Sequence, residues 1–287
     1  MSRLIEDIGT FLEANGFEYS FQIRYDFYVI CARTPDGMHT RVILPLEISA
    51  GTLEEAVAKS QKAYEAVQSI KALEGYPIII PEDRWNRQRP MMEARLLAHL
   101  ELFSQAYARN CEVRRIDKET AQRFLADNHS YGYAACKYRY GLFLKRQTGH
   151  IAREAQKDYV GTLIAVATFS NARKWIKDGK EIRSYEWTRY ASIPEMRVSG
   201  GMGKLLKAFI KDVQPDDIMS YADLEWSEGE VYKTLGFEEE LPKDPVSFEI
   251  DPETWERRAI KEDIHGGGLF YTNFGSRKLR LKLTEYQ

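Results

Sequence analysis

The apolar positions of the first 80 residues alternate between helical and strand-like spacing, in the order α-β-β-β-α-β. A helix over residues 3–14 is predicted because its apolar side chains share one face, and Asn15-Gly16 ends it. Thr52 is the expected N-cap of a second helix, since Glu55 follows three positions later. Strands are predicted over 17–24, 27–33, 40–48 and 76–80, with the second helix over 52–73 before the last of them. The pattern predicts a small α/β domain over residues 1–85.

Residues 81–89 are polar and contain proline, which predicts a connector, and a helix over about 90–107 is expected within a connecting segment over 86–110. The run 160–169 is the most apolar in the chain and is therefore expected to form a central strand. Further strands are predicted over 111–116, 140–145, 185–192 and 218–222, helices over 117–127 and 231–235, a polar loop over 146–158, and weaker strands over 269–274 and 279–283. These elements predict an α+β protein.

A glycine-rich turn, V-S-G-G-M-G-K-L-L over 198–206, lies between the strand 185–192 and a helical pattern with Leu205, Leu206 and Phe209 on one face. The first amides of a helix lack internal partners and its dipole favours negative charge there. Glycines remove side chains that keep a phosphate away from the backbone, and a lysine adds a cation. We therefore predict a pyrophosphate site from Val198, Ser199, Gly200, Gly201, Met202, Gly203 and Lys204. The alternative is a tight packing turn between strand and helix.

Composition and charge narrow the class of protein. The formal net charge is −2 over 287 residues, so no global positive field indicates nucleic acid or an anionic membrane. The apolar runs are shorter than the roughly 20 residues that span a bilayer, and Glu6 and Asp7 interrupt any signal-peptide core. Cys31, Cys111 and Cys136 form neither a disulfide framework nor a zinc pattern. We expect a cytoplasmic protein without a bound metal.

Three features in the correct order resemble the GNAT superfamily of acyl-CoA-dependent N-acyltransferases. The glycine turn resembles that family's R/Q-x-x-G-x-G/A motif, with Gly201 and Gly203 at the glycine positions and Val198 in place of the basic residue. The strand Y-E-W-T-R-Y-A-S, residues 185–192, matches the strand that leads into the motif, and V-Y-K-T-L-G-F, residues 231–237, resembles the family's short helix. The resemblance implies a mixed central sheet flanked by helices over 111–287.

This resemblance implies transfer of an acyl group from acetyl-CoA, or another acyl-CoA, to an amine. Glu186 would take the amine proton, directly or through water, and Tyr232 would protonate the departing thiolate. Backbone amides of Ala191, Ser192 and Ile193 would hold the pantetheine arm, next to the pyrophosphate at the glycine turn. The acceptor side would be lined by His129, Tyr131, Lys137, Arg189, Asp223, Glu225 and Trp226.

Each of these assignments has a simpler structural alternative. Glu186 is also compatible with a solvated strand residue and Tyr232 with a core tyrosine. His129 is compatible with a capping or loop role. Asp223, Glu225 and Trp226 are compatible with a turn that carries a stacking tryptophan.

A second resemblance, carried by A-R-N-C-E-V-R-R-I, F-L-A-D-N-H-S-Y-G, K-Y-R-Y-G-L-F and S-Y-A-D-L-E-W-S-E-G-E, is to phage GNAT-like proteins and Mom-type enzymes that modify adenine in DNA. It implies nucleobase modification as an alternative, with His129, Tyr131 and Trp226 handling an extruded base. A further alternative is a noncatalytic protein that binds nucleic acid or a partner through basic clusters such as 84–89 and 137–139.

The N-terminal order α-β-β-β-α-β resembles the PD-(D/E)xK nuclease core, with Asp26 opening the second strand and Glu47-Ile48-Ser49 closing the third. That family has a lysine where Ser49 stands, and the cation helps to activate water beside a metal. The substitution favours a degenerate nuclease fold used for binding, or an unrelated scaffold, over live cleavage.

Overall fold

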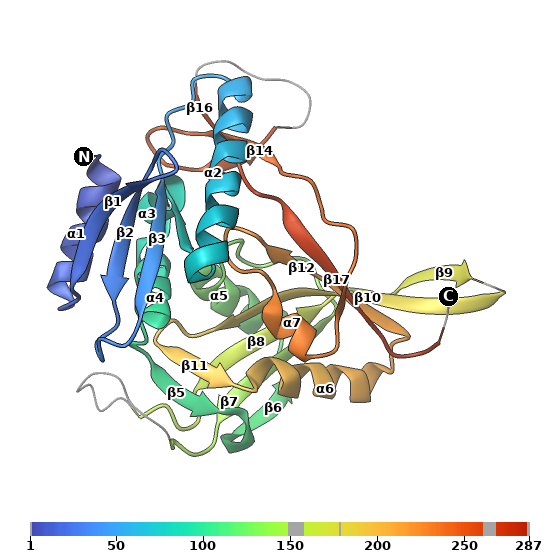
Figure 1. Cartoon of the computed structure of the whole chain (residues 1–287). Helices are drawn as coiled ribbons and strands as arrows, with labels where there is room; N and C mark the ends of the chain where they lie inside the picture. Colours follow the sequence, from blue (N-terminus) through green and yellow to red (C-terminus); the bar gives the residue numbers. More distant parts are fainter. Residues whose placement is uncertain (1, 149–157, 178, 261–267, 286–287) are drawn as a thin grey trace. The chain divides into compact units, whose positions relative to one another are not determined.

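The computed structural model describes residues 2–148, 158–177, 179–260 and 268–285, and the chain divides into two compact units (Figure 1). Unit 1 comprises Met1–Leu102, Ala222–Glu228 and Pro242–Arg277, and unit 2 comprises Phe103–Tyr221, Gly229–Leu241 and Lys278–Gln287. No helix among the described residues is both long and apolar enough to cross a membrane.

Unit 1 is built on a four-stranded sheet of order β1-β2-β3-β4, in which only β3 and β4 are parallel. The strands are β1 (Tyr19–Arg24), β2 (Phe27–Arg33), β3 (Thr40–Leu46) and β4 (Ile78–Pro81), and the helices are α1 (Arg3–Ala14), α2 (Leu53–Glu74), α3 (Glu82–Arg87) and α4 (Arg89–His99). A second sheet of order β15-β14-β16 contains β14 (Ser247–Ile250), β15 (Arg257–Ala259) and β16 (Leu269–Thr272).

The two faces of the four-stranded sheet bury separate cores. Successive side chains of a strand point to opposite faces. Ile30 therefore packs with α1, α3 and α4, whereas its neighbour Val29 packs with α2. Thr52 caps α2 as expected, because its side chain accepts a hydrogen bond from the Glu55 amide at 3.2 Å. Local sequence patterns thus account for the first six elements of the chain.

Residues 81–89 do not form a connector. They fold into α3 and the start of α4, and Asp83, Arg84 and Trp85 are buried. The polar sequence conceals this burial because the charges are compensated inside the unit: Arg257 forms an ion pair with Asp83. In a single sequence, a charged residue that is buried and paired cannot be told from a charged residue on the surface, where most charged residues lie.

Unit 2 is built on an eight-stranded mixed sheet of order β13-β17-β12-β10-β8-β7-β6, with β9 paired to β10. Its strands are β6 (Cys111–Arg115), β7 (Tyr138–Leu144), β8 (Leu163–Phe169), β9 (Arg173–Lys177), β10 (Lys180–Ser192), β12 (Asp217–Asp223), β13 (Glu238–Glu239) and β17 (Ser276–Lys282). The short strands β5 (Ser104–Tyr107) and β11 (Met196–Ser199) form a separate parallel pair, and η1 (Ala108–Asn110) follows β5. The helices are α5 (Lys118–Asn128), α6 (Gly201–Val213) and α7 (Glu230–Thr234).

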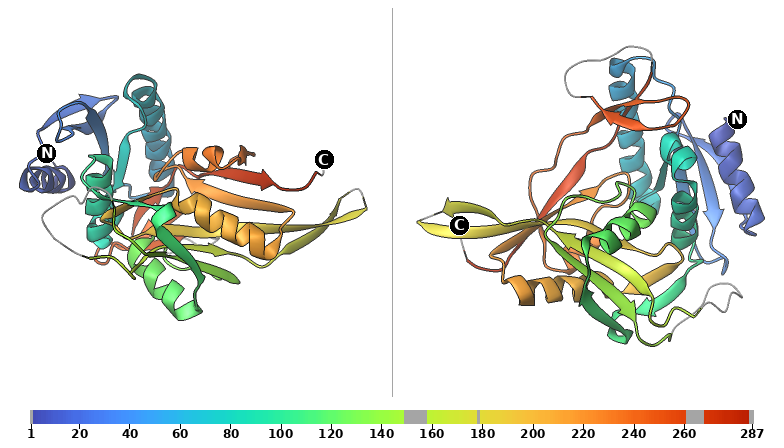
Figure 2. Two further views of the ribbon diagram at one scale, coloured as in Figure 1. Left: turned by 90° about the horizontal axis from the view of Figure 1, so that it is seen from below. Right: turned by 180° about the vertical axis from the view of Figure 1, so that it is seen from behind.

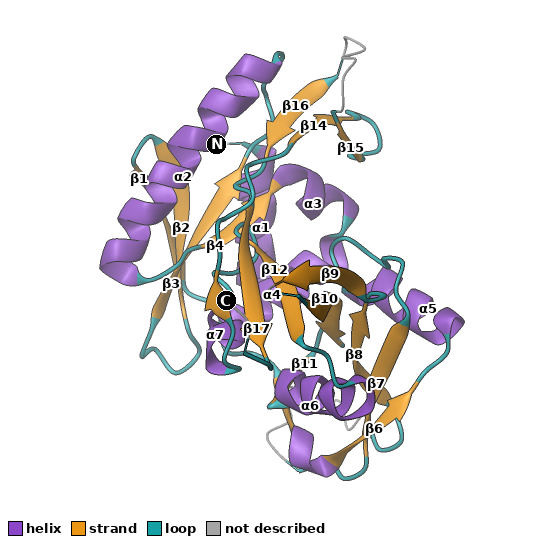
Figure 3. Cartoon of the chain, turned by 90° about the vertical axis from the view of Figure 1, so that its right-hand side faces the viewer, coloured by secondary structure: helices purple, strands orange, loops and turns teal. Residues whose placement is uncertain are grey.

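Helices α5 and α6 cover opposite faces of this sheet (Figures 2 and 3). On one face Phe209 of α6 stacks on Phe169 of β8, with ring centroids 3.8 Å apart. On the other, Leu125 of α5 packs with Val166 of β8. The α+β class and the mixed central sheet flanked by helices are therefore confirmed.

Several predicted boundaries after residue 89 are wrong. The helix expected over 90–107 ends at His99, because Glu101 has a positive φ of 67° and residues 104–107 pair with β11 as β5. The strand expected from residue 160 begins at Leu163. No strand was predicted between 169 and 185, but residues 173–177 form β9, which pairs with a β10 that starts five residues earlier than predicted. Part of the loop expected over 146–158 lies outside the described residues.

Candidate functional site

The parallel strands β10 and β12 separate partway along their length. Among the described residues their register covers Ser184↔Asp217 to Glu186↔Met219, although β10 continues to Ser192 and β12 to Asp223. At the same level the pairing of β10 with β8 shifts register between Trp187 and Arg189. A bulge of this kind bends a strand and redirects its side chains. We call the place where the β10–β12 pairing ends the fork.

The glycine turn leads directly into α6, and each of its glycines has a local structural reason. Gly200 has a φ of 75°, a left-handed conformation that side chains disfavour. A Cβ on Gly201 would lie 2.9 Å from Val198 Cγ1, and one on Gly203 would lie 3.1 Å from Leu235 Cδ2. Gly200 is the N-cap of α6 and supplies no side-chain cap, and in the described part of the chain no side chain caps the first amides of this helix, an arrangement that suits an anionic ligand.

Lys204 does not point its ammonium group toward an open turn. Its Nζ donates hydrogen bonds to the carbonyl oxygens of Ala108 at 2.8 Å and Cys111 at 2.5 Å. Val198, at the head of the motif, is 9% exposed on β11, whereas its neighbour Arg197 is exposed. The structure therefore gives Lys204 a structural role, and its contact with a phosphate stays a prediction.

Tyr232 of α7 places its hydroxyl group at the fork. Its Oη lies 3.0 Å from Ser220 Oγ, and Ser220 Oγ lies 3.0 Å from the carbonyl oxygen of Trp187. The Tyr232 ring packs edge-on against Trp187, with centroids 5.6 Å apart. Burial raises the pKa of Tyr232, and the hydrogen bond with Ser220 opposes this only in part. The tyrosine therefore stays protonated at neutral pH.

Glu186 is the last residue of β10 in register with β12, and it faces away from Tyr232. Trp187 packs against Tyr232, so the preceding side chain points to the opposite face of the sheet. The backbone of Glu186 is fixed by Ser170, whose Oγ accepts from the Glu186 amide at 2.9 Å. Within the described part of the chain no hydrogen bond to the Glu186 carboxylate is found, and this side chain is half-buried.

The strand end proposed to hold a pantetheine arm is partly engaged within the sheet. Ala191 and Ser192 are in register with Val166 and Ala165 of β8. The Ile193 amide donates to the Ile164 carbonyl oxygen at 3.0 Å, which removes it as a donor to a ligand. The roles of Ala191 and Ser192 stay predictions.

Four of the residues assigned to the acceptor side belong to unit 2, and three of these lie together. The Tyr131 amide donates to His129 Nδ1 at 3.1 Å, and the Arg189 guanidinium carbon lies 6.0 Å from the centre of the Tyr131 ring. Burial lowers the pKa of Arg189, whereas the nearby Glu186 carboxylate raises it. Lys137 is not part of this group. Its ammonium lies 5.6 Å from the Tyr138 ring, and that ring also packs with Tyr185 and Phe209 on the α6 face of the sheet.

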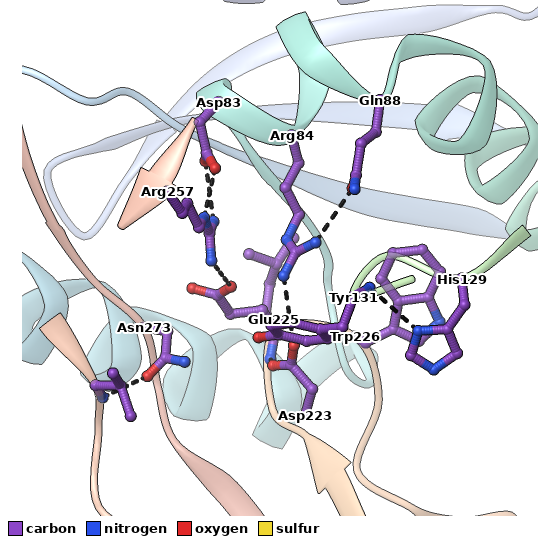
Figure 4. A network of polar contacts seen from close by, with 12 residues as sticks. Asp83, Arg84, Gln88, His129, Tyr131, Asp223, Glu225, Trp226, Arg257 and Asn273 are labelled. Atoms are coloured by element: carbon purple, nitrogen blue, oxygen red, sulfur yellow. Dashed lines mark hydrogen bonds and ion pairs between the residues drawn. The ribbon is translucent and has the colours of Figure 1, made fainter. Parts of the chain in front are cut away.

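The remaining three acceptor candidates, Asp223, Glu225 and Trp226, belong to unit 1. Figure 4 shows the Arg257 guanidinium between Asp83 and Glu225. Glu225 is 2% exposed and also accepts a hydrogen bond from the Tyr271 hydroxyl, and burial raises its pKa. Asp223 and Trp226 take part in the same polar network: Arg84 lies 4.0 Å from Asp223, and Arg95 lies 4.4 Å from the Trp226 ring. These contacts give all three residues structural roles in unit 1.

Unit 1 contains a cavity of about 220 Å³ at the carboxyl end of β3. Asp26, Glu47 and Ser49, the residues of the nuclease-like pattern, line it together with Lys59 of α2. Lys59 Nζ donates to Ser49 Oγ at 2.7 Å, so a lysine from elsewhere in the chain lies beside the position where the pattern lacks one. No group of three or more His, Cys, Asp or Glu that could hold a metal ion is found among the described residues.

Ser220 and Trp187 are the residues at the fork that the sequence did not reveal. The only signal was a serine inside the apolar strand I-M-S-Y-A, where a hydroxyl needs a hydrogen-bond partner. Ser220 is 1% exposed, so its hydroxyl group depends on these two contacts for hydrogen-bond partners.

Comparisons with known proteins give structural likeness only. No family model matches the chain, and no curated protein matches it. Among solved structures it is similar to yncA of Salmonella typhimurium, named as an acetyltransferase and solved with its cofactor acetyl-CoA, with 13% identity over 62% of this chain and 96% of that one and a TM-score of 0.34. A GNAT-family acetyltransferase of Bacillus anthracis matches with 12% identity over 60% and 95% of the two chains and a TM-score of 0.32.

A structure from Corynebacterium glutamicum, named as histone acetyltransferase HPA2 and related acetyltransferase, matches with 14% identity over 84% of this chain and 98% of that one and a TM-score of 0.29. At TM-scores below 0.5, neither the activity nor the ligand of these proteins transfers to this chain.

Proposed function

We propose that unit 2 transfers an acyl group from an acyl-CoA to an amine acceptor. The observation that carries the proposal is the hydroxyl of Tyr232 at the fork between β10 and β12, in the same unit as the uncapped start of α6. A long thioester substrate suits this unit in three ways. Its pyrophosphate is favoured at a helix N-terminus, its thioester can lie at the break in the sheet, and its thiolate leaving group can take a proton from a tyrosine with a raised pKa.

In this mechanism the pyrophosphate of the co-substrate binds the first amides of α6, and its thioester lies in the fork. The neutral amine attacks the thioester carbonyl, so that a C–N bond forms and the C–S bond breaks. Glu186 takes the proton of the amine, directly or through water, and Tyr232 gives a proton to the thiolate. Because Glu186 and Tyr232 face opposite sides of the sheet, deprotonation of the amine and protonation of the leaving group occur on opposite sides of the reacting carbon.

The test is binding of coenzyme A followed by turnover of acetyl-CoA. Isothermal titration and thermal unfolding are measured with CoA and with ATP, whose triphosphate lacks a pantetheine arm. CoA is expected to bind and raise the unfolding temperature more than ATP, because a ligand stabilises the state that it binds. Release of free thiol from acetyl-CoA is then measured with spermidine, lysine and a peptide that has a free N-terminal amine. Absence of CoA binding overturns the proposal.

The exocyclic amine of a nucleobase is a second candidate acceptor. Tyr131 is 41% exposed beside the Arg189 guanidinium, and such an aromatic–cation pair suits stacking of a base. Single-stranded DNA is therefore expected to bind at low salt, where phosphate contacts are strongest, and to lose affinity in Tyr131→Ala. Absence of binding at low salt removes this candidate and leaves a small or peptide amine as the acceptor.

A further inference from the structure

Ser220 occupies the first position of β12 beyond the paired part of the β10–β12 ladder. Met219 is the last β12 residue in register with β10, where it lies opposite Glu186. At the next position the Ser220 side chain, rather than the backbone, makes the link to β10, through Oγ and the Trp187 carbonyl oxygen at 3.0 Å. The side chain of Ser220 therefore makes a contact between β12 and β10 at the first position where their backbone pairing has ended.

The hydrogen bonds of Ser220 cannot all be donated at once. A serine hydroxyl carries one proton, and a carbonyl oxygen can only accept. When Tyr232 is protonated, every group is satisfied if Tyr232 donates to Ser220 Oγ and Ser220 donates to Trp187. When Tyr232 has lost its proton, its phenolate can only accept, so the Ser220 hydroxyl must turn from Trp187 to Tyr232.

We propose that Ser220 is the positioning residue of the general acid, and that its hydroxyl turns from the Trp187 carbonyl to the Tyr232 oxygen as Tyr232 protonates the departing thiolate. This inference rests on the proposed function. The O–H bond of Tyr232 breaks as the S–H bond of CoA forms, and the proton of Ser220 stays on Ser220 throughout. Tyr232 is reprotonated from solvent by the equivalent of the proton that the amine has lost.

The burial of Ser220 and Tyr232 strengthens the effect of the hydrogen bond between their hydroxyl groups. Ser220 is 1% exposed and Tyr232 is half-buried, so the Ser220 hydroxyl is the donor already in place for a phenolate at this position. Burial raises the pKa of Tyr232 and the Ser220 hydrogen bond lowers it, which is the direction expected if Ser220 stabilises the deprotonated form. A hydrogen bond to a charged group is stronger than one between neutral groups.

The kinetic test uses Ser220→Ala, Ser220→Thr, Tyr232→Phe and the Ser220→Ala/Tyr232→Phe double variant, with acetyl-CoA and the amine that gives the fastest thiol release. Ser220→Ala is expected to lower kcat about 10- to 100-fold with little change in KM for acetyl-CoA, the loss expected for a hydrogen bond to a charged group. Ser220→Thr retains the hydroxyl and should stay within about threefold of wild type. In the Tyr232→Phe background Ser220→Ala should cost almost nothing, because it acts through the tyrosine.

A spectroscopic test reads the same contact without turnover. Tyr232 is replaced by 3,5-difluorotyrosine, which ionises at lower pH, and its absorbance is titrated with and without Ser220→Ala. The variant should raise the pKa of the fluorotyrosine by about one unit or more. Ser184→Ala serves as the matched control, since Ser184 is also a buried serine of the sheet but hydrogen-bonds to Asp217.

The outcomes separate this inference from the function on which it rests. A wild-type protein that does not bind acetyl-CoA overturns the proposed function and this role with it. If the wild type is active, any one of three results overturns the role of Ser220 alone. These are an equal loss of kcat from Ser220→Ala with Tyr232 and with Phe at position 232, low activity of Ser220→Thr, and a fluorotyrosine titration that Ser220→Ala does not change.

Discussion

The ammonium group of Lys204 is held by the carbonyl oxygens of Ala108 and Cys111, at 2.8 and 2.5 Å. This lysine follows the glycine turn and is the residue that the sequence assigns to a phosphate. Its hydrogen bonds instead link the first turn of α6 to the first residue of η1 and the first residue of β6.

Lys204→Met should therefore act on stability more than on ligand affinity. Loss of the ammonium leaves two carbonyl oxygens without their donor, which costs about 1–3 kcal/mol of unfolding free energy. Urea denaturation measures this cost, with Lys207→Met, an exposed lysine of the same helix, as the control. Titration with CoA should show a change in Kd of less than about threefold. A much larger loss of affinity at unchanged stability would restore the phosphate-binding role.

Tyr232→Phe removes the proposed general acid while keeping the ring that packs on Trp187. The expected loss in kcat is about 100- to 10,000-fold, with CoA affinity retained. In the wild type, burial raises the pKa of Tyr232 and the protonated form is the active one, so kcat should hold through neutral pH and fall only above the ordinary range of tyrosine ionisation. Full turnover by Tyr232→Phe would eliminate this residue as the acid.

Gly200→Ala tests the left-handed conformation at the start of α6. The added methyl group has room, since its nearest neighbour would be Ala108 Cβ at 3.5 Å. Any loss of stability is therefore due to the φ of 75° and not to a steric clash. The expected destabilisation is about 1–2 kcal/mol in urea denaturation. Gly200→Asn should cost less, because asparagine adopts this conformation more readily than alanine. Equal effects of the two substitutions would point to contacts rather than to backbone conformation.

Arg257→Met leaves Asp83 and Glu225 buried without their shared cation, and is expected to lower the free energy of unfolding of unit 1 by about 3–5 kcal/mol. Arg258→Met is the matched control: its side chain is 65% exposed and 3.9 Å from Asp251, so the expected cost is under about 1 kcal/mol. Similar losses in both variants would show that the buried network contributes no more than a surface pair.

The cost of Arg257→Met should also depend on pH. Burial raises the pKa of Glu225, so this carboxyl group favours the folded state most at pH values below its unfolded pKa, and the contribution is lost as pH rises through the folded pKa. Removing the nearby guanidinium raises that pKa further. Urea denaturation near pH 4 and near pH 7 should therefore show a smaller cost at the lower pH, where Glu225 is protonated.

Elements that depend on local sequence were predictable. The face of α1, the cap of α2 at Thr52 and the place of the glycine turn before α6 all rest on residues within a few positions of one another. The sequence also assigned the glycine turn and Tyr232 to the same domain, and both lie in unit 2. The roles of these residues stay predictions.

Features that depend on distant partners were not predictable. The strand β5 exists because residues 104–107 pair with residues 196–199, about 90 positions away in the sequence. The burial of Asp83 depends on Arg257, which lies 174 positions later. Ser220 was overlooked for the same reason, since its partners Trp187 and Tyr232 come from two other elements. No single-sequence pattern encodes these pairings.

The fork also gives the sheet an edge in its interior. Beyond Glu186 and Met219, β10 and β12 continue without the ladder that joins them earlier, so backbone groups in the middle of a sheet face a gap in strand pairing. Exposed edges commonly invite another strand. A pantetheine arm carries two amide groups and can fill this place as a strand would, in which case hydrogen exchange at residues 187–192 and 220–221 should slow when CoA binds. Occupancy of the site would then complete the sheet.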